Sequence, residues 1–367
     1  MTVPPRGDDP HGLPLMSRHL VCRASDAAFA IPGNRAQGSE SGVRVPPVVR
    51  EPRIHSAGTV TSAGDGGADA TGFRRWAAVG EGNGAVHTGF GICELQPGGS
   101  VPAHVHSFEQ SCYIIEGSAV LSTAEGSLLL EAGDYGLVPV GMPHEWRNDG
   151  DAVARWADLQ APQPRGRFGD DTVLVPLECH HAPVRLDVRD PRSRSFGHIT
   201  AASMDAARQT QDLLAVSASM RTALLVYSGI TVKMMIDTDL GAQLSTMFMV
   251  QYAPDGVAGA HDHPFEETYL ILEGSADATF DGEHYRLGPG DIAWAGAGCV
   301  HAFGNAGEPK GPVRWLETQA PQPPSRHSYR FARDWEYLGA ALGGSAGTAG
   351  AHTEGPEHTE GNGAWQM

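Results

Sequence analysis

The sequence predicts an all-β protein that contains two tandem barrels built from short strands. A histidine-bearing pattern occurs twice at a constant offset of 157 positions, for example at His104 and His261, and a repeat at a fixed offset indicates a repeated structural unit. Short apolar runs such as Cys112–Ile115 and Thr268–Leu272 are bounded by Glu-Gly, Asp-Gly and Pro-Gly signals, which favour a sandwich or barrel over βαβ units. The 367 residues leave room for two domains with extensions.

Two further signals mark individual strands. An Asp-Gly pair that begins at Asp281, between Ala276–Phe280 and His284–Leu287, predicts a two-residue hairpin turn. The segment Arg155–Pro164 recurs as Arg314–Pro323. We interpret this second repeat as the closing strand of each barrel and its exit.

The repeated pattern places three histidines and one further polar side chain at equivalent positions of both halves. The first copy contains His104, His106, Gln110, Gly117, Gly133, Pro139, Gly141, His144 and Asn148. The second copy contains His261, His263, Glu267, Gly274, Gly290, Gly296, Gly298, His301 and Asn305. Only the Gln/Glu and Pro/Gly pairs differ in residue type.

The spacing of the second copy predicts a metal site. Residues i and i+2 of a strand share a face, so His261 and His263 point together, and the same parity reaches Glu267 beyond the interrupting Pro264. His301 arrives from a later strand. Imidazole and carboxylate ligands suit Fe, Mn, Ni, Cu or Zn, and a site with open positions is catalytic rather than structural. We therefore expect one divalent transition metal in each active barrel.

The first copy predicts a weaker site formed by His104, His106, Gln110 and His144. An amide oxygen is a neutral and weaker ligand than a carboxylate, and the neighbouring Glu109 has the wrong strand parity. A histidine on a strand is more often a core or surface residue than a ligand. The sequence thus leaves open whether the first barrel binds metal, and it favours activity in the second.

In these residues the chain resembles the cupin superfamily, and the duplication resembles a bicupin. The family motif G(X)4–5HXH(X)3–4E(X)6G corresponds to the segment from Gly256 to Gly274, and G(X)5PXG(X)2H(X)3N to the segment from Gly290 to Asn305, with Gly296 in place of proline. The resemblance covers roughly residues 72–164 and 221–323. It implies two double-stranded β-helix (jelly-roll) barrels and metal sites, and it does not specify a reaction.

The predicted domain order follows from these motifs and from composition. Residues 1–70 form an extension, largely disordered, in which His19–Pro32 is a candidate arm that pairs with a barrel edge. Barrel 1 spans residues 71–164, a connector 165–220, barrel 2 residues 221–323, and a terminal region 324–367. The connector has one candidate helix, Ala202–Leu214, with Ser203 as its cap. A second candidate helix, Ser328–Leu342, precedes a disordered tail rich in Gly, Ala and Thr.

Net charge and cysteine content indicate which binding partners and which cellular compartment to expect. The net charge of −17 and the absence of long basic clusters argue against nucleic acid or an anionic membrane as partners. No apolar run of membrane-spanning length and no leader pattern is found, so a cytoplasmic location is expected. Five cysteines without a CxxC motif are not a disulfide framework. Barrel edges offer a way for copies to pair as a homo-oligomer.

Three functions fit such a site. The first is a dioxygenase-type oxidoreductase in barrel 2 that acts on a small enolisable or aromatic substrate, with Glu267 as ligand or general base and Tyr269 and Trp294 as pocket walls. The second is a redox-neutral, metal-dependent decarboxylase, isomerase or aminohydrolase. The third is a bicupin that binds a small ligand without catalysis.

Overall fold

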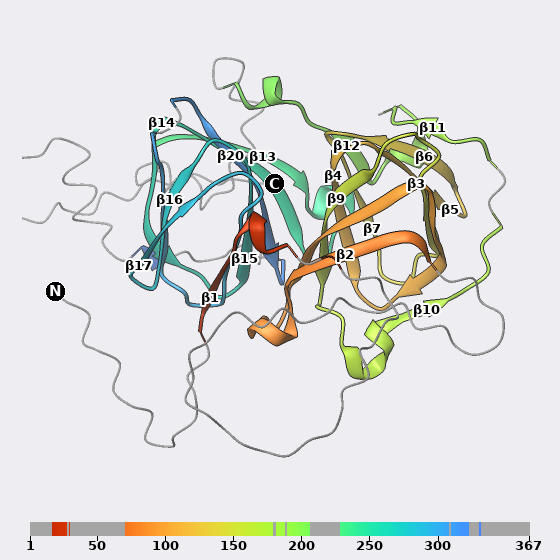
Figure 1. Cartoon of the computed structure of the whole chain (residues 1–367), viewed down its shortest axis with the longest axis horizontal. Coiled ribbons are helices and arrows are strands. Elements are labelled where there is room, and N and C mark those ends of the chain that lie inside the picture. Colours follow the sequence, from red (N-terminus) through yellow and green to blue (C-terminus); the bar gives the residue numbers. More distant parts are fainter. Residues whose placement is uncertain are drawn as a thin grey trace, which may run out of the picture.

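Two curled β-sheets lie side by side in the computed structural model of the chain (Figure 1). The structure describes residues 17–27, 29, 70–178, 181–187, 189–205, 228–307, 310–322 and 330–331. The predicted disordered regions at residues 1–16 and 31–69 and the predicted disordered tail after Leu342 lie outside this set, as does most of the candidate helix Ser328–Leu342. Each sheet forms a jelly-roll barrel, as the repeat predicts.

Barrel 1 is an 11-stranded sheet in which strands far apart in the sequence pair. Its strands are β2 (Thr71–Val79), β3 (Gly89–His106), β4 (Glu109–Glu116), β5 (Ser118–Thr123), β6 (Gly126–Glu131), β7 (Asp134–Val138), β8 (His144–Arg147), β9 (Ala154–Ala161), β10 (Thr172–Leu174), β11 (Val184–Arg185) and β12 (Phe196–His198). The order is β11-β6-β5-β8-β3-β9-β4-β7-β12, with β2 and β10 also paired to β3. The long strand β3 therefore contacts four partners.

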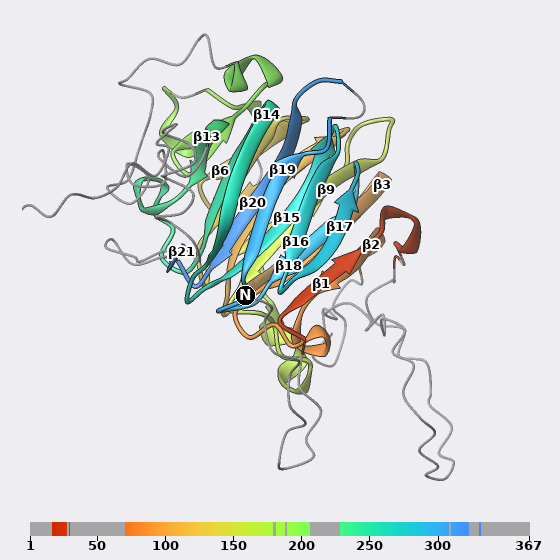
Figure 2. The same cartoon turned by 90° about the vertical axis from the view of Figure 1, so that its left-hand side faces the viewer.

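Barrel 2 repeats this arrangement in a 10-stranded sheet (Figure 2). Its strands are β1 (His19–Cys22), β13 (Ser228–Ile236), β14 (Thr246–Asp262), β15 (Glu266–Glu273), β16 (Ala276–Phe280), β17 (Glu283–Leu287), β18 (Ile292–Ala295), β19 (His301–Asn305), β20 (Val313–Ala320) and β21 (Arg330–Phe331). The order is β1-β18-β15-β20-β14-β19-β16-β17, with β13 and β21 on β14. The hairpin turn predicted at Asp281 joins β16 to β17 and is confirmed.

The helical content of the described residues consists of short 3-10 turns: η1 (Ala24–Asp26), η2 (Glu81–Asn83), η3 (Gly166–Asp171), η4 (Pro191–Ser193), η5 (Ala201–Met204) and η7 (Thr238–Leu240). None of the described helices is long and apolar enough to cross a lipid bilayer.

The prediction of a helix over Ala202–Leu214 is wrong in its described part. A 3-10 turn covers Ala201–Met204, and Asp205 is already extended, with φ −65° and ψ 114°. The reciprocal hydrogen bonds of a capping box join Thr200 and Ser203, so Thr200 and not Ser203 is the cap residue. Residues 206–214 lie outside the described part.

Segments predicted to lie outside the barrels contribute strands to them. The connector supplies β10, β11 and β12 to barrel 1. The N-terminal arm forms β1, which pairs with β18 of barrel 2. Arg330–Phe331 forms strand β21 along β14, which is a correction to the helix predicted over Ser328–Leu342. The reason in each case is an unpaired sheet edge, which a short extended segment can satisfy by backbone hydrogen bonds.

Three buried apolar clusters hold the molecule together. One lies inside barrel 1 and includes Trp156, and another lies inside barrel 2 and includes Trp315. The third contains residues of both barrels, among them Trp76 and Phe90 from barrel 1 and Trp294 from barrel 2. Because large apolar side chains from both barrels are buried in this third cluster, the two barrels share one core across their interface.

A reciprocal pair of glutamates also links the barrels. Glu266, at the start of β15, accepts hydrogen bonds from the backbone nitrogens of Val86, His87 and Thr88 at 2.7–3.1 Å. Glu109, at the equivalent position of β4, accepts hydrogen bonds from the backbone nitrogens of residues 243–245 and from the Ser245 hydroxyl. Both carboxylates are buried, and this set of donors replaces the water that burial removes.

Candidate metal centres

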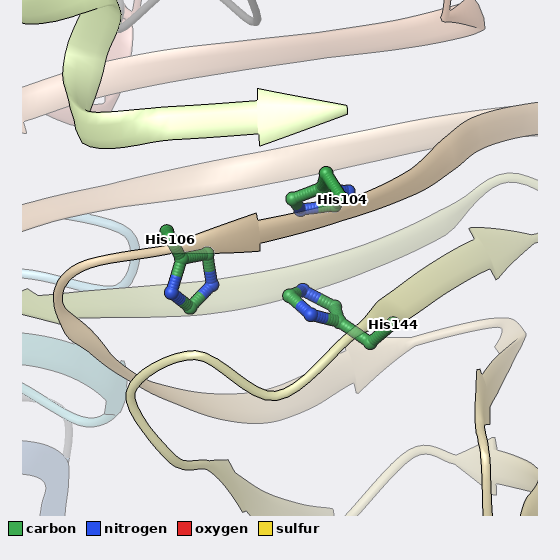
Figure 3. Close-up of side chains that lie close together, drawn as sticks. All are labelled: His104, His106 and His144. Atoms are coloured by element: carbon green, nitrogen blue, oxygen red, sulfur yellow. The ribbon is translucent and has the colours of Figure 1, made fainter. Parts of the chain in front are cut away.

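Three histidines converge inside barrel 1 (Figure 3). His104 and His106 lie at the end of β3, and His144 begins β8, where it pairs with His104. One ligand nitrogen from each of the three lies within 4.8 Å of the other two. All three side chains are buried. Strand parity brings the first two together, and the β3–β8 register adds the third.

Hydrogen bonds orient each imidazole of this triad. Nδ1 of His104 lies 2.8 Å from the carbonyl oxygen of residue 102, Nδ1 of His106 lies 2.7 Å from that of residue 108, and Nδ1 of His144 lies 3.0 Å from that of residue 142. A carbonyl oxygen only accepts, so Nδ1 carries the proton in each ring and Nε2 keeps its lone pair. Nε2 of His144 is buried and has no hydrogen-bond partner among the described residues. This donor set fits a divalent transition metal.

The electrostatic environment keeps the barrel 1 histidines neutral, as metal ligation requires. Burial lowers the pKa of His104 to about 4, and burial also lowers the pKa of His106. Burial and the two neighbouring histidines hold the pKa of His144 well below its usual range.

Gln110 lies beside this triad with its amide oriented by a buried carboxylate. Its Oε1 is 3.3 Å from Nε2 of His106, and its Nε2 donates to Oδ1 of Asp158 at 2.5 Å. The other carboxylate oxygen of Asp158 accepts a hydrogen bond from Nε of Arg75 at 2.8 Å. Asp158 thus takes the donor end of the amide and turns the oxygen of Gln110 toward the triad.

Sequence reasoning missed Arg75 and Asp158. Asp158 lies in the repeated closing segment, two residues before Gln160, and strand parity alone places it on the same face as Trp156. Strand parity could therefore have placed Asp158 inside the barrel, but it does not show that Asp158 contacts Gln110. Arg75 carries no motif, and its place depends on the β2–β3 register that pairs it with Cys93.

Barrel 2 contains the second triad in the same arrangement. His261 and His263 come from the end of β14, and His301 begins β19, with ligand nitrogens again within 4.8 Å of one another. Their Nδ1 atoms lie 2.8–3.0 Å from the carbonyl oxygens of residues 259, 265 and 299. Burial lowers the pKa of His261 to about 3.

Glu267 joins this triad. Its Oε2 is 2.8 Å from Nε2 of His263 and 3.3 Å from Nε2 of His301, and its Oε1 accepts from Gln319 at 2.6 Å. Burial works to raise the pKa of Glu267, but the charge and hydrogen bond of His263, together with His301, hold it well below the usual range. The four predicted ligands of barrel 2 therefore lie together, with the carboxylate ionised.

Of the two predicted pocket walls, Tyr269, also a catalytic candidate, lies beside the metal ligands of barrel 2, and Trp294 does not. The Tyr269 hydroxyl donates to Oε2 of Glu267, and its ring packs against Phe303 at a centroid distance of 4.5 Å. Tyr269 is only 2% exposed. Trp294 is a correction, because it points out of the barrel into the cluster shared by both barrels. Its strand β18 is short, and the parity of one four-residue strand does not say which face meets the partner barrel.

A cavity of about 60 Å³ adjoins the barrel 1 triad. Its lining includes His104, His106, Gln110 and Arg75, together with the indole rings of Trp146 and Trp156. One water needs roughly 10–15 Å³ by this measure, so the cavity has room for a few waters or a small ligand. The triad of barrel 1 therefore lies beside space that a substrate can occupy.

A third group, formed by His19, Asp281 and Cys299, also brings ligand atoms within 4.8 Å. There the Asp281 carboxylate receives both Nε and Nη2 of Arg18, at 3.0 and 2.8 Å. A guanidinium that already neutralises the carboxylate of this group disfavours a cation. The ion pair between Arg18 and Asp281 instead attaches the N-terminal arm to barrel 2.

The model of the cupin domain matches the chain twice, at residues 91–159 and 248–318. These matches cover the core strands of both barrels, from within β3 to β9 and from within β14 to β20. The chain therefore belongs to the cupin superfamily and is a bicupin. A comparison with curated proteins finds no match.

Solved structures of similar fold include two bicupin-like enzymes. A salicylate 1,2-dioxygenase from Pseudaminobacter salicylatoxidans superposes with a TM-score of 0.51 at 14% identity, over 72% of this chain and 75% of that one. A Lactobacillus farciminis oxalate decarboxylase in complex with formate gives a TM-score of 0.51 at 16% identity, over 89% of this chain and 94% of that one. At such identities the likeness establishes the fold, and the chemistry must be argued from the site.

Proposed function

We propose that this bicupin is a metal-dependent oxidoreductase of the dioxygenase type that acts on a small molecule in barrel 1. The observation that carries the proposal is the cavity that lies directly against His104 and His106. The complete ligand set of Glu267 and three histidines favoured barrel 2 at the level of sequence. We place the proposed reaction in barrel 1 because a reaction needs space beside the metal as well as ligands, and the cavity beside His104 and His106 provides that space.

A divalent transition metal held by His104, His106 and His144 would supply Lewis acidity and, for a redox-active ion, the capacity to activate O2. The residues of the chain orient the metal ligands and restrict the access of water. Their Nδ1 hydrogen bonds hold the three rings in one orientation, which fixes the direction of the Nε2 lone pairs. Gln110 offers a neutral oxygen beside them. The apolar faces of Trp146 and Trp156 limit access of water to the cavity.

Barrel 2 is proposed as a second metal site with a mainly structural role. Its carboxylate is enclosed by Gln319 and Tyr269, and aromatic rings including Phe280 and Phe303 pack next to the triad. These contacts tie the ligands together and restrict the movement that Glu267 would need as a general base.

The test compares two matched histidine variants of the purified full-length chain. His106→Ala removes a ligand of barrel 1 and His263→Ala removes the equivalent ligand of barrel 2. Metal content is measured by elemental analysis without affinity metal, and O2 uptake is measured with a panel of small enolisable and aromatic compounds. We expect a metal-to-chain ratio near two that falls to about one in both variants, with O2 uptake abolished by His106→Ala and retained in His263→Ala.

Other outcomes separate the alternatives. Turnover that persists without oxygen would show a decarboxylase, isomerase or aminohydrolase instead of an oxidoreductase. Ligand binding without turnover in the parent protein would show a binding protein. Loss of all activity in His263→Ala alone would return the reaction to barrel 2, and a metal ratio near zero after growth with abundant metal would contradict the enzyme proposal.

A further inference from the structure

A buried cation lies beside the cavity of barrel 1. The Arg75 residue is only 6% exposed and lines the cavity together with His104 and His106. Its Nε donates to Asp158 and its guanidinium also interacts with the buried Cys93 thiol, but its buried Nη2 has no oxygen acceptor in the part of the chain that the structure describes. A buried charged donor without an acceptor is costly. A ligand that brings an acceptor to Nη2 would remove that cost.

A glycine on the neighbouring strand β3 leaves room for the Arg75 guanidinium. A Cβ atom on Gly91 would lie 3.0 Å from both Cζ and Nη2 of Arg75, and 2.4 Å from the backbone oxygen of Trp76. Only glycine leaves this room, because any other side chain would displace the backbone and the guanidinium together. Gly91 also pairs directly with Asp158 across β3 and β9. The glycine that leaves room for the Arg75 guanidinium therefore lies next to Asp158, the residue that accepts the hydrogen bond of Arg75.

Barrel 2 has a different set of side chains at the same positions. In register with the β2–β3 pair, the β13–β14 pair puts Val232 where barrel 1 has Arg75 and Phe248 where it has Gly91. Glu317 pairs with Phe248 as Asp158 pairs with Gly91. Glu267 replaces Gln110. The cation of barrel 1 is thus absent from the equivalent position, and a ligand carboxylate is added.

This difference makes the surroundings of the barrel 1 triad less negative than those of the barrel 2 triad. In barrel 1 the three histidines and Gln110 are neutral, and Asp158 balances Arg75, so the charge of a bound divalent metal would remain uncompensated. In barrel 2 the ionised Glu267 offsets part of that charge.

We propose that barrel 1 binds a small carboxylate between Arg75 and the histidine triad, and that barrel 2 takes no such anion. The Arg75 guanidinium, which lines the cavity, donates to one carboxylate oxygen, and the metal side of the cavity receives the other end of the anion. The volume of about 60 Å³ restricts the ligand to a small acid, and the two indole rings favour an apolar or flat remainder. This inference rests on the proposed metal site of barrel 1.

The experiment measures binding to the Co(II)-loaded full-length protein by calorimetry and by the visible spectrum of cobalt. The probes are propionate and benzoate, each paired with its neutral amide of the same shape, propionamide and benzamide. We expect at least one acid to bind once per chain and to shift the cobalt spectrum, with the matching amide at least tenfold weaker. Equal binding of acid and amide, or no binding of any of the four, would overturn the proposal.

Four variants assign the anion to Arg75. Arg75→Met should weaken the acid at least tenfold with unchanged cobalt content, and Arg75→Lys should weaken it less. Arg74→Gln is the matched control, because Arg74 on the same strand pairs with Glu94 and should leave binding unchanged. In the fourth variant Arg75→Met is combined with Asp158→Asn, which keeps an oxygen for Gln110 and removes the uncompensated buried carboxylate. This double variant decides the result if Arg75→Met alone does not fold.

The outcomes also separate this inference from the proposed function. Anion binding that depends on Arg75 in a protein that consumes no O2 would leave the anion site standing and remove the oxidative reaction. Unchanged binding in every folded Arg75 variant would remove the anion site, whatever the activity. Loss of anion binding in His263→Ala, with cobalt still present in barrel 1, would place the anion in barrel 2 and contradict the inference.

Discussion

At the scale of residues, the fourth side chain beside each histidine triad differs between the barrels, and so does its hydrogen-bond partner. Gln110 donates to Asp158, whereas Glu267 accepts from Gln319 and Tyr269. Each site is consistent within itself, because an amide needs an acceptor on its nitrogen and a carboxylate needs donors on both oxygens. An exchange of glutamine and glutamate between the barrels would therefore change the metal ligand and also break the hydrogen bonds that orient it.

The substitution Gln110→Glu tests this dependence. It removes the donor to Asp158 and brings two buried carboxylates together, so we expect the metal-free protein to lose about 1–3 kcal/mol of stability. Added metal should recover more stability in this variant than in the parent, because the introduced carboxylate is a charged ligand. Urea unfolding with and without metal measures both effects.

The combination of Gln110→Glu with Asp158→Asn is the control, since it restores a donor opposite the new carboxylate. It should regain most of the lost stability. If Gln110→Glu is as stable as the parent without metal, the Gln110–Asp158 hydrogen bond does not have the role assigned to it.

At the scale of elements, the strand that carries each fourth ligand also joins the two barrels. Glu266 begins β15 and reaches the loop after β2, whereas the next residue, Glu267, points into barrel 2. Glu109 and Gln110 are related in the same way on β4. Alternation along a strand gives adjacent residues these opposite roles.

The substitution Glu266→Ala should destabilise the protein by about 1–3 kcal/mol, because it leaves the backbone donors of Val86, His87 and Thr88 without their acceptor in a partly buried place. Chemical denaturation checks the size of the effect. Glu283→Ala, in which an exposed carboxylate of barrel 2 is removed, should change stability by less than about 0.5 kcal/mol. Equal effects of the two substitutions would show that the buried contact is not a stabilising one.

At the scale of the whole molecule, the shared cluster around Trp76, Phe90 and Trp294 makes each barrel part of the other's core. Separation of the barrels would expose this apolar surface and break both glutamate contacts. We therefore expect one cooperative thermal transition for the metal-free chain, seen by calorimetry and by tryptophan fluorescence at the same temperature. Two resolved transitions would show that the barrels are independent units.

Much of the architecture was predictable because it depends on short-range spacing. Two histidines at i and i+2 share a face in any strand, and an offset of 157 positions repeats the same local unit. The triads, the duplicated barrels and the hairpin at Asp281 follow from such patterns. Strand β21 did not, because local helical spacing yields there to backbone pairing with a sheet edge. The end of the 3-10 turn at Met204 did not follow from local spacing either.

The environment of each site depends on which distant strands pair, and only the tertiary structure decides that. Arg75, Gly91, Gln110 and Asp158 come from four strands, β2, β3, β4 and β9, and no local pattern connects them. The same holds for Glu109 and Glu266, which parity excludes from the metal sites without naming their partners. The chain's own sequence thus specifies two barrels with histidine triads, since strand periodicity is local. The cavity and cation beside one triad arise from long-range register, which is why the proposed reaction moves to barrel 1.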